Sequence, residues 1–514
     1  MAIPGLPIFH RLAGDAPADF ARVTAAQWTE AARAVHESGG RLVALWGADR
    51  RDAGAAFSVY AAYATAEGLS VVDLHVSEAD SSYPDVSGLF FPAARMQRAV
   101  RDLVGLSALG AADARPWLRH GAWGEAEYPL RREFDPAAPR ENAAGPYPFV
   151  RVEGDGVHEI PVGPIHAGII EPGHFRFSVV GEKVLRLEER LGYTHKGIDR
   201  RFQDFTVETG HRLAGRCSGD STVAYGWAYA QAAEALLAVV VPPRARWLRA
   251  LMLECERIAN HLGDLGALGN DAAFGFALAH FSRLREDWLR ACDRAFGHRL
   301  LMDRIVPGGV ASDLKGGTRR EMASLSEAVE REARTMRDIY DEHSGLQDRF
   351  ITAGRVTPEL ARTLGLVGLA GRASGQARDL RADFPAEPYD RLAVKVAGHP
   401  AGDVAARVRV RYEELFESLR LVRAILDGVP EGDVRVELPD AKPGAFGVGW
   451  VEGWRGEVFV AIEAGEANRI RRAHAHDPSW QNWPVVEHAI MGNIVPDFPL
   501  INKSFNLSYS GPDC

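Results

Sequence analysis

Cysteine is scarce in this chain. Among 514 residues there are only four, and they lie far apart in the sequence. So few scattered thiols do not form a disulfide framework, and they favour a reducing, cytosolic compartment. The four are Cys217, Cys255, Cys292 and Cys514.

Long apolar runs are missing as well. The strongest, Ala235 to Val241, is closed by Pro242 and Pro243 and falls far short of the ~20 residues that span a bilayer. We therefore expect any association with a membrane to come through partner subunits.

Clustered positive charge is also lacking. The net charge is −9 and no run of lysine and arginine occurs, so we do not expect a nucleic-acid partner. The pair Gly308 and Gly309 lacks the strand-to-helix context of a phosphate loop, so we assign no nucleotide site. What is present is an ordinary globular composition, 46% hydrophobic and 25% charged, with a length that suits roughly two or three domains.

A segment rich in proline, alanine and glycine divides the chain. Residues 135–148 read DPAAPRENAAGPYP and predict a linker. Before it, residues 1–134 carry short β-type runs, such as 41–46 and 71–76, between helical patterns. We predict that this part is an α/β domain.

The second part, residues 149–514, begins with an alternating pattern over His174–Val180 and Lys183–Glu188 that predicts a β-hairpin. Long helical patterns follow, each with one apolar face. We therefore predict an α+β fold, with a small β element before a bundle of long helices. The residues of these faces are Trp247, Leu248, Leu251, Cys255, Ile258 and Leu262; Met322, Leu325, Val329 and Met336; and Leu415, Leu419, Val422 and Leu426.

Motifs in the first part resemble the C subunit of respiratory complex I and the equivalent domain fused to hydrogenase large subunits. The resemblance implies a docking domain that carries no cofactor. The motifs are Tyr83-Pro84-Asp85, residues 89–94, residues 117–120 and residues 128–134.

Motifs in the second part resemble the D subunit of complex I and the large subunit of membrane-bound (group 4, formate hydrogenlyase-type) [NiFe] hydrogenases. Together the two resemblances cover about residues 40 to 513. In the last of these motifs Trp454 stands where hydrogenases have proline, which indicates a rebuilt cleft. The motifs are residues 162–175, 191–199, 372–375, 379–381 and 451–457.

The resemblance places other residues where hydrogenases have their two C-x-x-C pairs. Ser218 and Ser221 fall at the first pair, and Ser508 and Gly511 at the second. Nickel and iron in such a site need thiolates; a serine hydroxyl has too high a pKa to replace one, and glycine has no side chain. We therefore expect no nickel and assign no metal ligand, although a replacement site built from Cys217 and Cys514 stays an alternative.

Three residues are candidates for catalysis by resemblance. His166 lies in the loop where complex I has a histidine that hydrogen-bonds a quinone headgroup, and an imidazole can donate to a quinone carbonyl. Glu171 lies near a hydrogenase carboxylate that moves protons, and Tyr225 stands where hydrogenases have a histidine. The alternatives are a histidine that satisfies its own loop, a surface glutamate and a core tyrosine.

Arg257 and His261 lie four residues apart on one predicted helix, in a pattern that resembles the E-R-x-x-N-H helix of both families. There the two side chains lie beside the iron–sulfur cluster of a partner small subunit, and a nearby cation raises the reduction potential of a cluster. Ordinary ion pairing within the helix is the alternative.

The resemblance implies a peripheral-arm subunit on the cytoplasmic face of the inner (plasma) membrane. It would pass electrons from an iron–sulfur small subunit to quinone, as an NADH-quinone oxidoreductase-like enzyme that acts only within its complex. The alternative is a non-catalytic scaffold that couples a redox module to antiporter-like integral membrane subunits. The donor, whether NADH, ferredoxin or formate, is left open, and NAD is expected only on other subunits.

Overall fold

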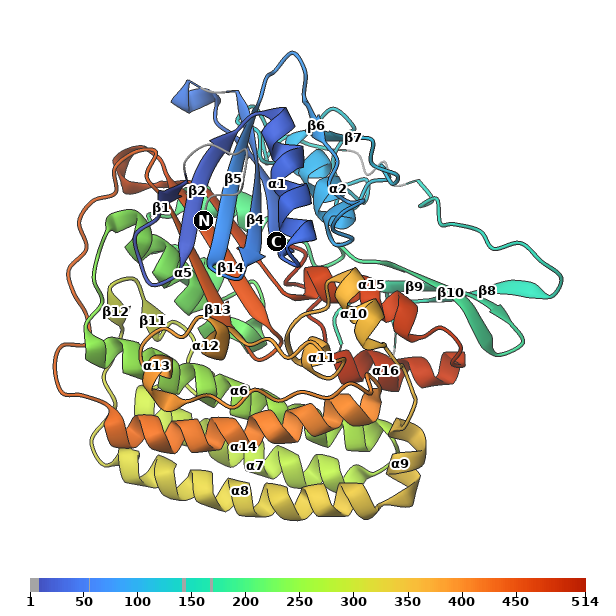
Figure 1. Ribbon diagram of the computed structural model, residues 1–514, viewed down its shortest axis with the longest axis vertical. Coiled ribbons are helices and arrows are strands. Elements are labelled where there is room, and N and C mark those ends of the chain that lie inside the picture. The colour runs from blue at the N-terminus through green and yellow to red at the C-terminus, as the bar shows by residue number, and fades with distance from the viewer. Residues whose placement is uncertain (1–8, 55, 141–144, 167–169) are drawn as a thin grey trace.

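The N-terminal part forms a mixed sheet with two helices beside it (Figure 1). The computed structural model describes residues 9–54, 56–140, 145–166 and 170–514. The five strands lie in the order β1-β2-β5-β4-β3, and β2 runs parallel to β5. The elements are β1 His10–Arg11, β2 Ala18–Val23, α1 Ala25–Glu37, β3 Arg41–Asp49, β4 Phe57–Thr65, β5 Gly68–Val76, β6 Ser82–Pro84, α2 Ala93–Val104 and β7 Ser107–Leu109.

Local sequence explains these elements. Thr24 caps α1 through a hydrogen bond from the backbone of Gln27, whose side chain bonds back to Thr24. Val100 and Val104 of α2 pack over Gly47 of β3, where a larger residue would be crowded. Strands β3 and β5 confirm the predictions at 41–46 and 71–76.

A three-stranded arm projects from the body of the molecule (Figure 1). Its strands are β8 Val157–Val162, β9 His174–Val180 and β10 Lys183–Arg190, in the order β10-β9-β8. Strands β9 and β10 confirm the predicted hairpin. The loop between β8 and β9 carries His166 and Glu171, and residues 167–169 of it lie outside the described ranges.

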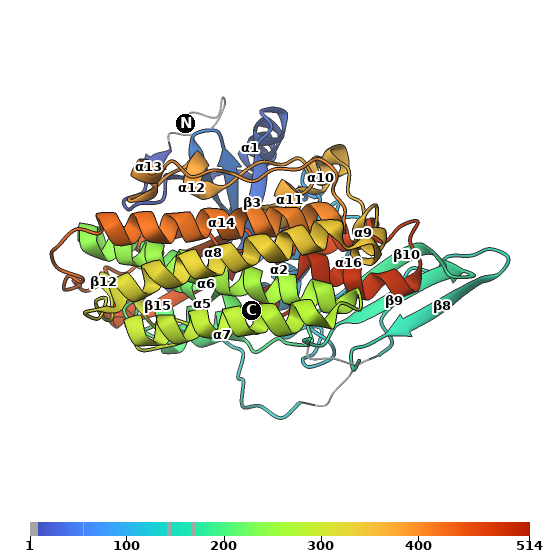
Figure 2. The same cartoon turned by 90° about the horizontal axis from the view of Figure 1, so that it is seen from below.

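Long helices form a bundle under the sheets (Figure 2). They are α5 Thr222–Leu237, α6 Pro243–Asp271, α7 Gly275–Phe296, α8 Thr318–Glu342 and α14 Val404–Gly428. The predicted apolar faces lie on α6, α8 and α14 and are buried there, apart from Leu325, which is half-buried. The α+β fold class is therefore confirmed.

Shorter elements connect the bundle to the rest. They are α3 Ile198–Arg201, α4 His211–Ala214, β11 Ile305–Val306, β12 Gly309–Val310, α9 Ser344–Phe350, α10 Pro358–Leu364, α11 Gly368–Arg372, α12 Leu380–Asp383, α13 Tyr389–Leu392, α15 Ser479–Ala489 and α16 Phe498–Phe505. Within the described ranges no helix has both the length and the apolar character that crossing a bilayer requires.

A third sheet, which the sequence did not predict, joins the two parts of the chain. Its strands are β13 Phe446–Glu452, β14 Glu457–Ala464 and β15 Ile470–His476. One face packs on α5. The other shares a core with the N-terminal sheet, where the ring centroids of Trp46 and Phe459 lie 5.5 Å apart. The division of the chain at 135–148 stays a prediction, and residues 141–144 lie outside the described ranges.

The contact between β13 and α5 is close enough to require glycine. A Cβ at Gly449 would overlap the carbonyl oxygen of Ala228, and one at Gly447 would overlap that of Ala232. We expect Gly449→Ala to lower the free energy of unfolding by roughly 3 kcal/mol or more, because backbone on both sides must move. Chemical unfolding followed by tryptophan fluorescence measures the change.

Gly88→Ala is the matched control for this substitution. Gly88 is exposed, and no atom lies within 4 Å of the position its Cβ would take. Equal unfolding midpoints for the two variants would show that β13 and α5 can separate at little cost.

Candidate active-site cleft

An open, polar cleft of 540 Å³ lies where the start of α5, helices α6 and α7, and the C-terminal segment meet. Side chains from separate parts of the chain contribute to its wall. Those that matter chemically are Glu171, Ser218, Asp220, Asn260, Arg455 and Ser508.

Of the four positions where the resemblance expects metal ligands, Ser218 and Ser508 line this cleft, and Ser221 and Gly511 contact residues that line it. The hydroxyl oxygens of Ser218 and Ser508 are 2.9 Å apart, although 290 residues separate them in the sequence. The backbone N–H of Gly511 donates to Ser508 Oγ at 2.9 Å. Ser221 Oγ accepts from Nη1 of Arg455 at 3.2 Å. These hydroxyls therefore bond to one another and to the protein.

The carboxylate of Asp477 occupies the space beside Gly511. A Cβ at residue 511 would lie 2.5 Å from Asp477 Oδ2. That same oxygen accepts from Tyr225 Oη at 2.8 Å, and the other accepts from the backbone N–H of Ser479 at 2.8 Å. A side chain at 511 has no room while this arrangement stands.

The donors around the cleft do not suit a nickel–iron centre. Hydroxyls are hard, weakly basic ligands, and three of the four positions carry a hydroxyl while the fourth has no side chain. Among the described residues, no group of three or more His, Cys, Asp or Glu side chains is placed to hold a metal ion. The hydroxyls and carboxylates of this wall can donate and accept hydrogen bonds.

A half-buried ion pair closes the inner wall. Both terminal nitrogens of Arg455 donate to Asp220, at 2.6 Å each. Burial alone would raise the pKa of Asp220, but Arg455 outweighs burial and holds the pKa below its ordinary value. Trp454, the residue that replaces proline, donates from Nε1 to the carbonyl oxygen of Asp220 at 2.9 Å.

The three predicted catalytic residues lie at different depths. Glu171 is exposed on the rim, where its Oε2 accepts from the backbone N–H of Ser510 at 3.1 Å. Tyr225 is fully buried behind the cleft, and burial raises its pKa well above the ordinary value. His166 is half-buried on the loop after β8. Asp477 thus bonds to Tyr225 and fills the space beside Gly511, but Tyr225 is not among the residues that line the cleft.

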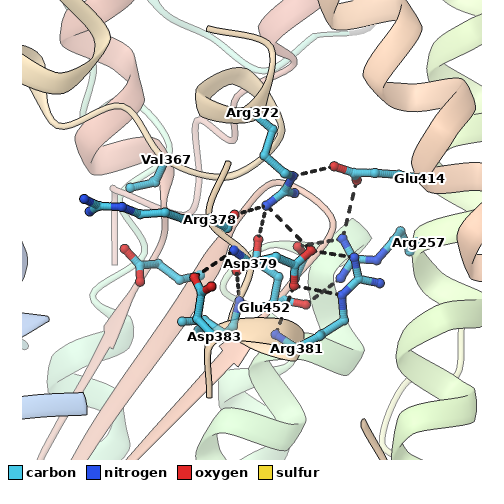
Figure 3. A network of polar contacts seen from close by, with 12 residues as sticks. Arg257, Val367, Arg372, Arg378, Asp379, Arg381, Asp383, Glu414 and Glu452 are labelled. Carbon is cyan, nitrogen blue, oxygen red and sulfur yellow. Dashed lines mark hydrogen bonds and ion pairs between the residues drawn. The ribbon is translucent and has the colours of Figure 1, made fainter. Parts of the chain in front are cut away.

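Arg257 lies inside a buried network of charged groups (Figure 3), and His261 contacts this network through Glu414. Arg257 donates to the carbonyl oxygens of Glu452 and Gly453, at 2.6 and 3.0 Å. His261 Nε2 lies 2.9 Å from Glu414 Oε2. Both side chains are fully buried, and the contacts described are hydrogen bonds within the protein; a partner's cluster stays a prediction.

Two buried acidic residues near the cleft were not predicted from the sequence. Asp477 follows β15 directly, and nothing in the sequence links it to Tyr225, 252 residues away. Glu256 lies on α6 and accepts from the backbone N–H groups of Val223 and Ala224 at 2.6 and 3.2 Å. Burial raises the pKa of Glu256 to about 8. The sequence feature that could have pointed to Glu256 is a glutamate within a helical pattern of apolar residues.

Comparison with known proteins gives matches across nearly the whole chain. The family model for the 30 kDa subunit of respiratory-chain NADH dehydrogenase matches residues 21–140, and the model for the 49 kDa subunit matches residues 271–445. Formate hydrogenlyase subunit 5 of Escherichia coli (strain K12) is 31% identical over 490 residues, which are 93% of this chain and 85% of that protein.

One further relative and one solved structure also match this chain. The C/D subunit of NADH-quinone oxidoreductase from Bacteroides thetaiotaomicron is 26% identical over 455 residues, which are 84% of each protein. A chain of the membrane-bound sulfane sulfur reductase, an archaeal respiratory membrane complex, superposes with a TM-score of 0.66. That match covers 70% of this chain and 99% of the other at 24% identity, and it shows the fold.

We predict that the purified protein contains no stoichiometric nickel, because hydroxyls and the Asp477 carboxylate fill the space around the four ligand positions. Elemental analysis by mass spectrometry measures this directly. A value of about one nickel per chain would contradict the prediction and direct attention to Cys217 and Cys514.

Glu256 predicts a pH dependence of stability. Its pKa is about 8 in the folded protein against an ordinary 4.5, so between these values the folded state binds more protons than the unfolded state. The free energy of unfolding therefore falls as pH rises through that window, by an amount on the order of a few kcal/mol. Glu256→Gln, which mimics the protonated form, should remove this part of the dependence.

Unfolding of the wild type and of Glu256→Gln at several pH values between about 5 and about 9 measures the difference. Glu327→Gln on the exposed face of α8 is the control and should follow the wild type. A constant difference between wild type and Glu256→Gln across this range would mean that Glu256 is ionised throughout.

Proposed function

This chain belongs to the family of fused 30 kDa- and 49 kDa-type subunits that includes formate hydrogenlyase subunit 5 and the C/D subunit of NADH-quinone oxidoreductase, and we propose that it is the peripheral-arm subunit of a membrane-bound oxidoreductase. It takes electrons from an iron–sulfur small subunit and passes them to quinone. Integral, antiporter-like subunits hold it at the cytoplasmic face of the inner membrane, and NAD is reached only through other subunits.

The observation that supports this proposal is the rebuilt cleft. It keeps the open, polar shape of a reaction site, but its wall offers hydroxyls, carboxylates and an ion pair in place of thiolates. Quinone reduction needs two electrons and two protons. A partner's cluster supplies the electrons, and a protein wall of this chemistry supplies hydrogen bonds and protons.

His166 is the proposed contact to the quinone headgroup. It lies on the same loop as Glu171, and Glu171 lines the cleft. At the base of this loop, His174 Nδ1 lies 2.9 Å from the carbonyl oxygen of Gly163. An imidazole donates to a quinone carbonyl and passes on a proton. Glu171 is the proposed exchange point for protons at the rim, and Tyr225 with Asp477 holds a hydroxyl proton behind it.

Arg257 and His261 are proposed to face the partner's cluster across Trp454. The indole of Trp454 stands at 90° to the His261 ring, with centroids 6.3 Å apart, and bonds to Asp220 in the cleft wall. A fixed guanidinium near a docked cluster would raise the reduction potential of that cluster.

A scaffold role is the second candidate, and two observations favour it. The hydroxyls at the former ligand positions already bond to partners within the protein, and Tyr225 does not line the cleft. In that case the chain couples a redox module to the membrane subunits without touching a substrate.

We predict that His166→Ala lowers quinone-linked electron transfer without dissociating the complex. The loss of a charge-capable hydrogen bond costs about 1.5–3 kcal/mol, which corresponds to a drop of about tenfold or more in turnover or apparent affinity. Quinone reduction and size-exclusion chromatography on the same preparation measure both properties.

His158→Ala is the matched control, because His158 is exposed on β8 of the same arm. The scaffold alternative forecasts that both histidine variants behave as wild type, whereas changes at Arg257 or His261 disturb assembly. An intact wild-type complex that reduces no quinone would exclude the catalytic role altogether.

A further inference from the structure

Two of the four cysteines lie together where α6 packs against α7 (Figure 2). Trp288 of α7 donates from Nε1 to the carbonyl oxygen of Cys255 on α6 at 3.1 Å, which fixes the position of one helix along the other. Cys292 lies one turn after Trp288 and so faces the same part of α6. Burial and then the Cys292 thiol raise the pKa of Cys255 well above its ordinary value, an effect that requires the two sulfur atoms to be neighbours.

A cavity of 120 Å³ lies beside these two thiols, and both cysteines line it. We call it the thiol chamber. It borders the cleft, because several residues line both spaces. A cavity needs about 10–15 Å³ to hold one water molecule, so the chamber has ample room for a metal ion. The residues shared with the cleft are Gly219, Asp220, Asn260, Arg285 and Leu289.

The oxygen-bearing side chains of the thiol chamber are already engaged with the protein. Both carboxylate oxygens of Asp220 accept from Arg455 at 2.6 Å. Glu256 accepts from two backbone N–H groups at the start of α5, at 2.6 and 3.2 Å. Asn260 donates to the carbonyl oxygens of Asp220 and Glu256 at 2.8 and 2.9 Å. The donors that this chamber offers to a metal ion are therefore the two sulfur atoms.

Two sulfur donors without further ligands suit a soft monovalent ion. Structural zinc takes four ligands, and an iron–sulfur cluster is held by about four thiolates. In the part of the chain that the structure describes, no group of three or more His, Cys, Asp or Glu side chains is placed to hold a metal ion. Cu(I) prefers thiolates, and its filled d shell permits linear coordination by two of them. The donor set therefore selects Cu(I).

The charge of such a complex can be offset within the thiol chamber. One Cu(I) ion with two thiolates carries a single negative charge, which is costly in an interior unless a cation lies near. Arg285 lines the chamber and donates from Nε to the carbonyl oxygen of Ala259 at 3.1 Å, and it forms no ion pair with a described residue. Arg299 also lines the chamber but is paired with Glu286. Arg285 is therefore the counter-charge for the complex.

The alternative is that both cysteines are only small apolar side chains of the core, which is a common use of a buried free cysteine. Core side chains are close-packed against their neighbours. Cys255 and Cys292 instead lie against a space large enough for an ion, and that space continues toward the cleft. The core alternative forecasts that neither thiol binds a metal ion.

We propose that Cys255 and Cys292 form a binding site for a soft monovalent metal ion, Cu(I), in the thiol chamber. This goes beyond the proposed function and does not depend on it. On binding, two S–H bonds break, two S–Cu bonds form and both protons pass to water, while copper stays in the +1 state. The bound ion ties α6 to α7 beside the cleft.

The test is an anaerobic titration of the intact complex with Cu(I), in competition with bathocuproine disulfonate, a chelator that is coloured when it holds Cu(I). The wild type should withdraw about one Cu(I) per chain more than Cys255→Ala or Cys292→Ala does. The difference between variants excludes copper bound by partner subunits. Equal uptake by the wild type and Cys255→Ala overturns the proposal and supports the core alternative.

Cys217→Ala is the matched control, because Cys217 is also buried but lies near Cys514 and does not line the thiol chamber. It should keep the ion that Cys255→Ala and Cys292→Ala lose. Loss of the ion in Cys217→Ala, with full uptake in Cys255→Ala, would place copper at the other thiol pair and overturn the proposal. If the alanine variants fail to assemble, Cys292→Ser takes their place, because serine keeps the shape of cysteine and its hydroxyl does not hold Cu(I).

X-ray absorption at the copper edge gives a second readout, on Cys217→Ala loaded with about one Cu(I) per chain. The ion should have two sulfur neighbours and no nitrogen or oxygen neighbour. A shell of nitrogen or oxygen atoms would contradict a site made of two thiolates. Neither measurement follows electron transfer, so the copper site and the proposed function can fail independently.

Discussion

The cost of burying charge governs the interior of this protein. The network around Arg372, the Arg455–Asp220 pair and the Arg41–Glu457 pair each join segments that are distant in the sequence. The side chains around Arg372 are out of contact with water, whereas Asp220 stays 40% exposed, and each pair restricts the position of both partners. These pairings connect the helix bundle, the third sheet and the cleft wall.

The cleft follows from the same constraint. Where the resemblance expects thiolates and metal, the protein has hydroxyls, a glycine and the carboxylate of Asp477, and these groups satisfy one another. The hydrogen bond between Tyr225 and Asp477 places a neutral donor beside that carboxylate, so that it is not left alone in the interior. Because these groups fill the space at the expected ligand positions, a single cysteine substitution would not create a metal site.

The sequence predicted the hairpin around Gly181, the buried faces of the long helices and the fold class, because each rests on a local period in the chain. It did not predict the third sheet. Two glycines interrupt β13, and β15 is rich in arginine and histidine, so neither segment has a strong strand signal. The surroundings of Asp477, Glu414 and Glu452 consist of contacts between residues far apart in the chain. No local sequence pattern could predict those contacts. The proximity of Ser218 to Ser508 came only through resemblance.

The core shared by the N-terminal sheet and the third sheet has a consequence for how the chain is divided. Trp46 and Tyr60 on one side pack with Trp450 and Phe459 on the other, as residues of a single domain do. A cut in the linker would therefore leave two fragments that stay bound, like the subunits of a permanent dimer. Fusion of the two parts in one polypeptide then adds little to their affinity, but it ensures that they are made in equal numbers and meet during synthesis.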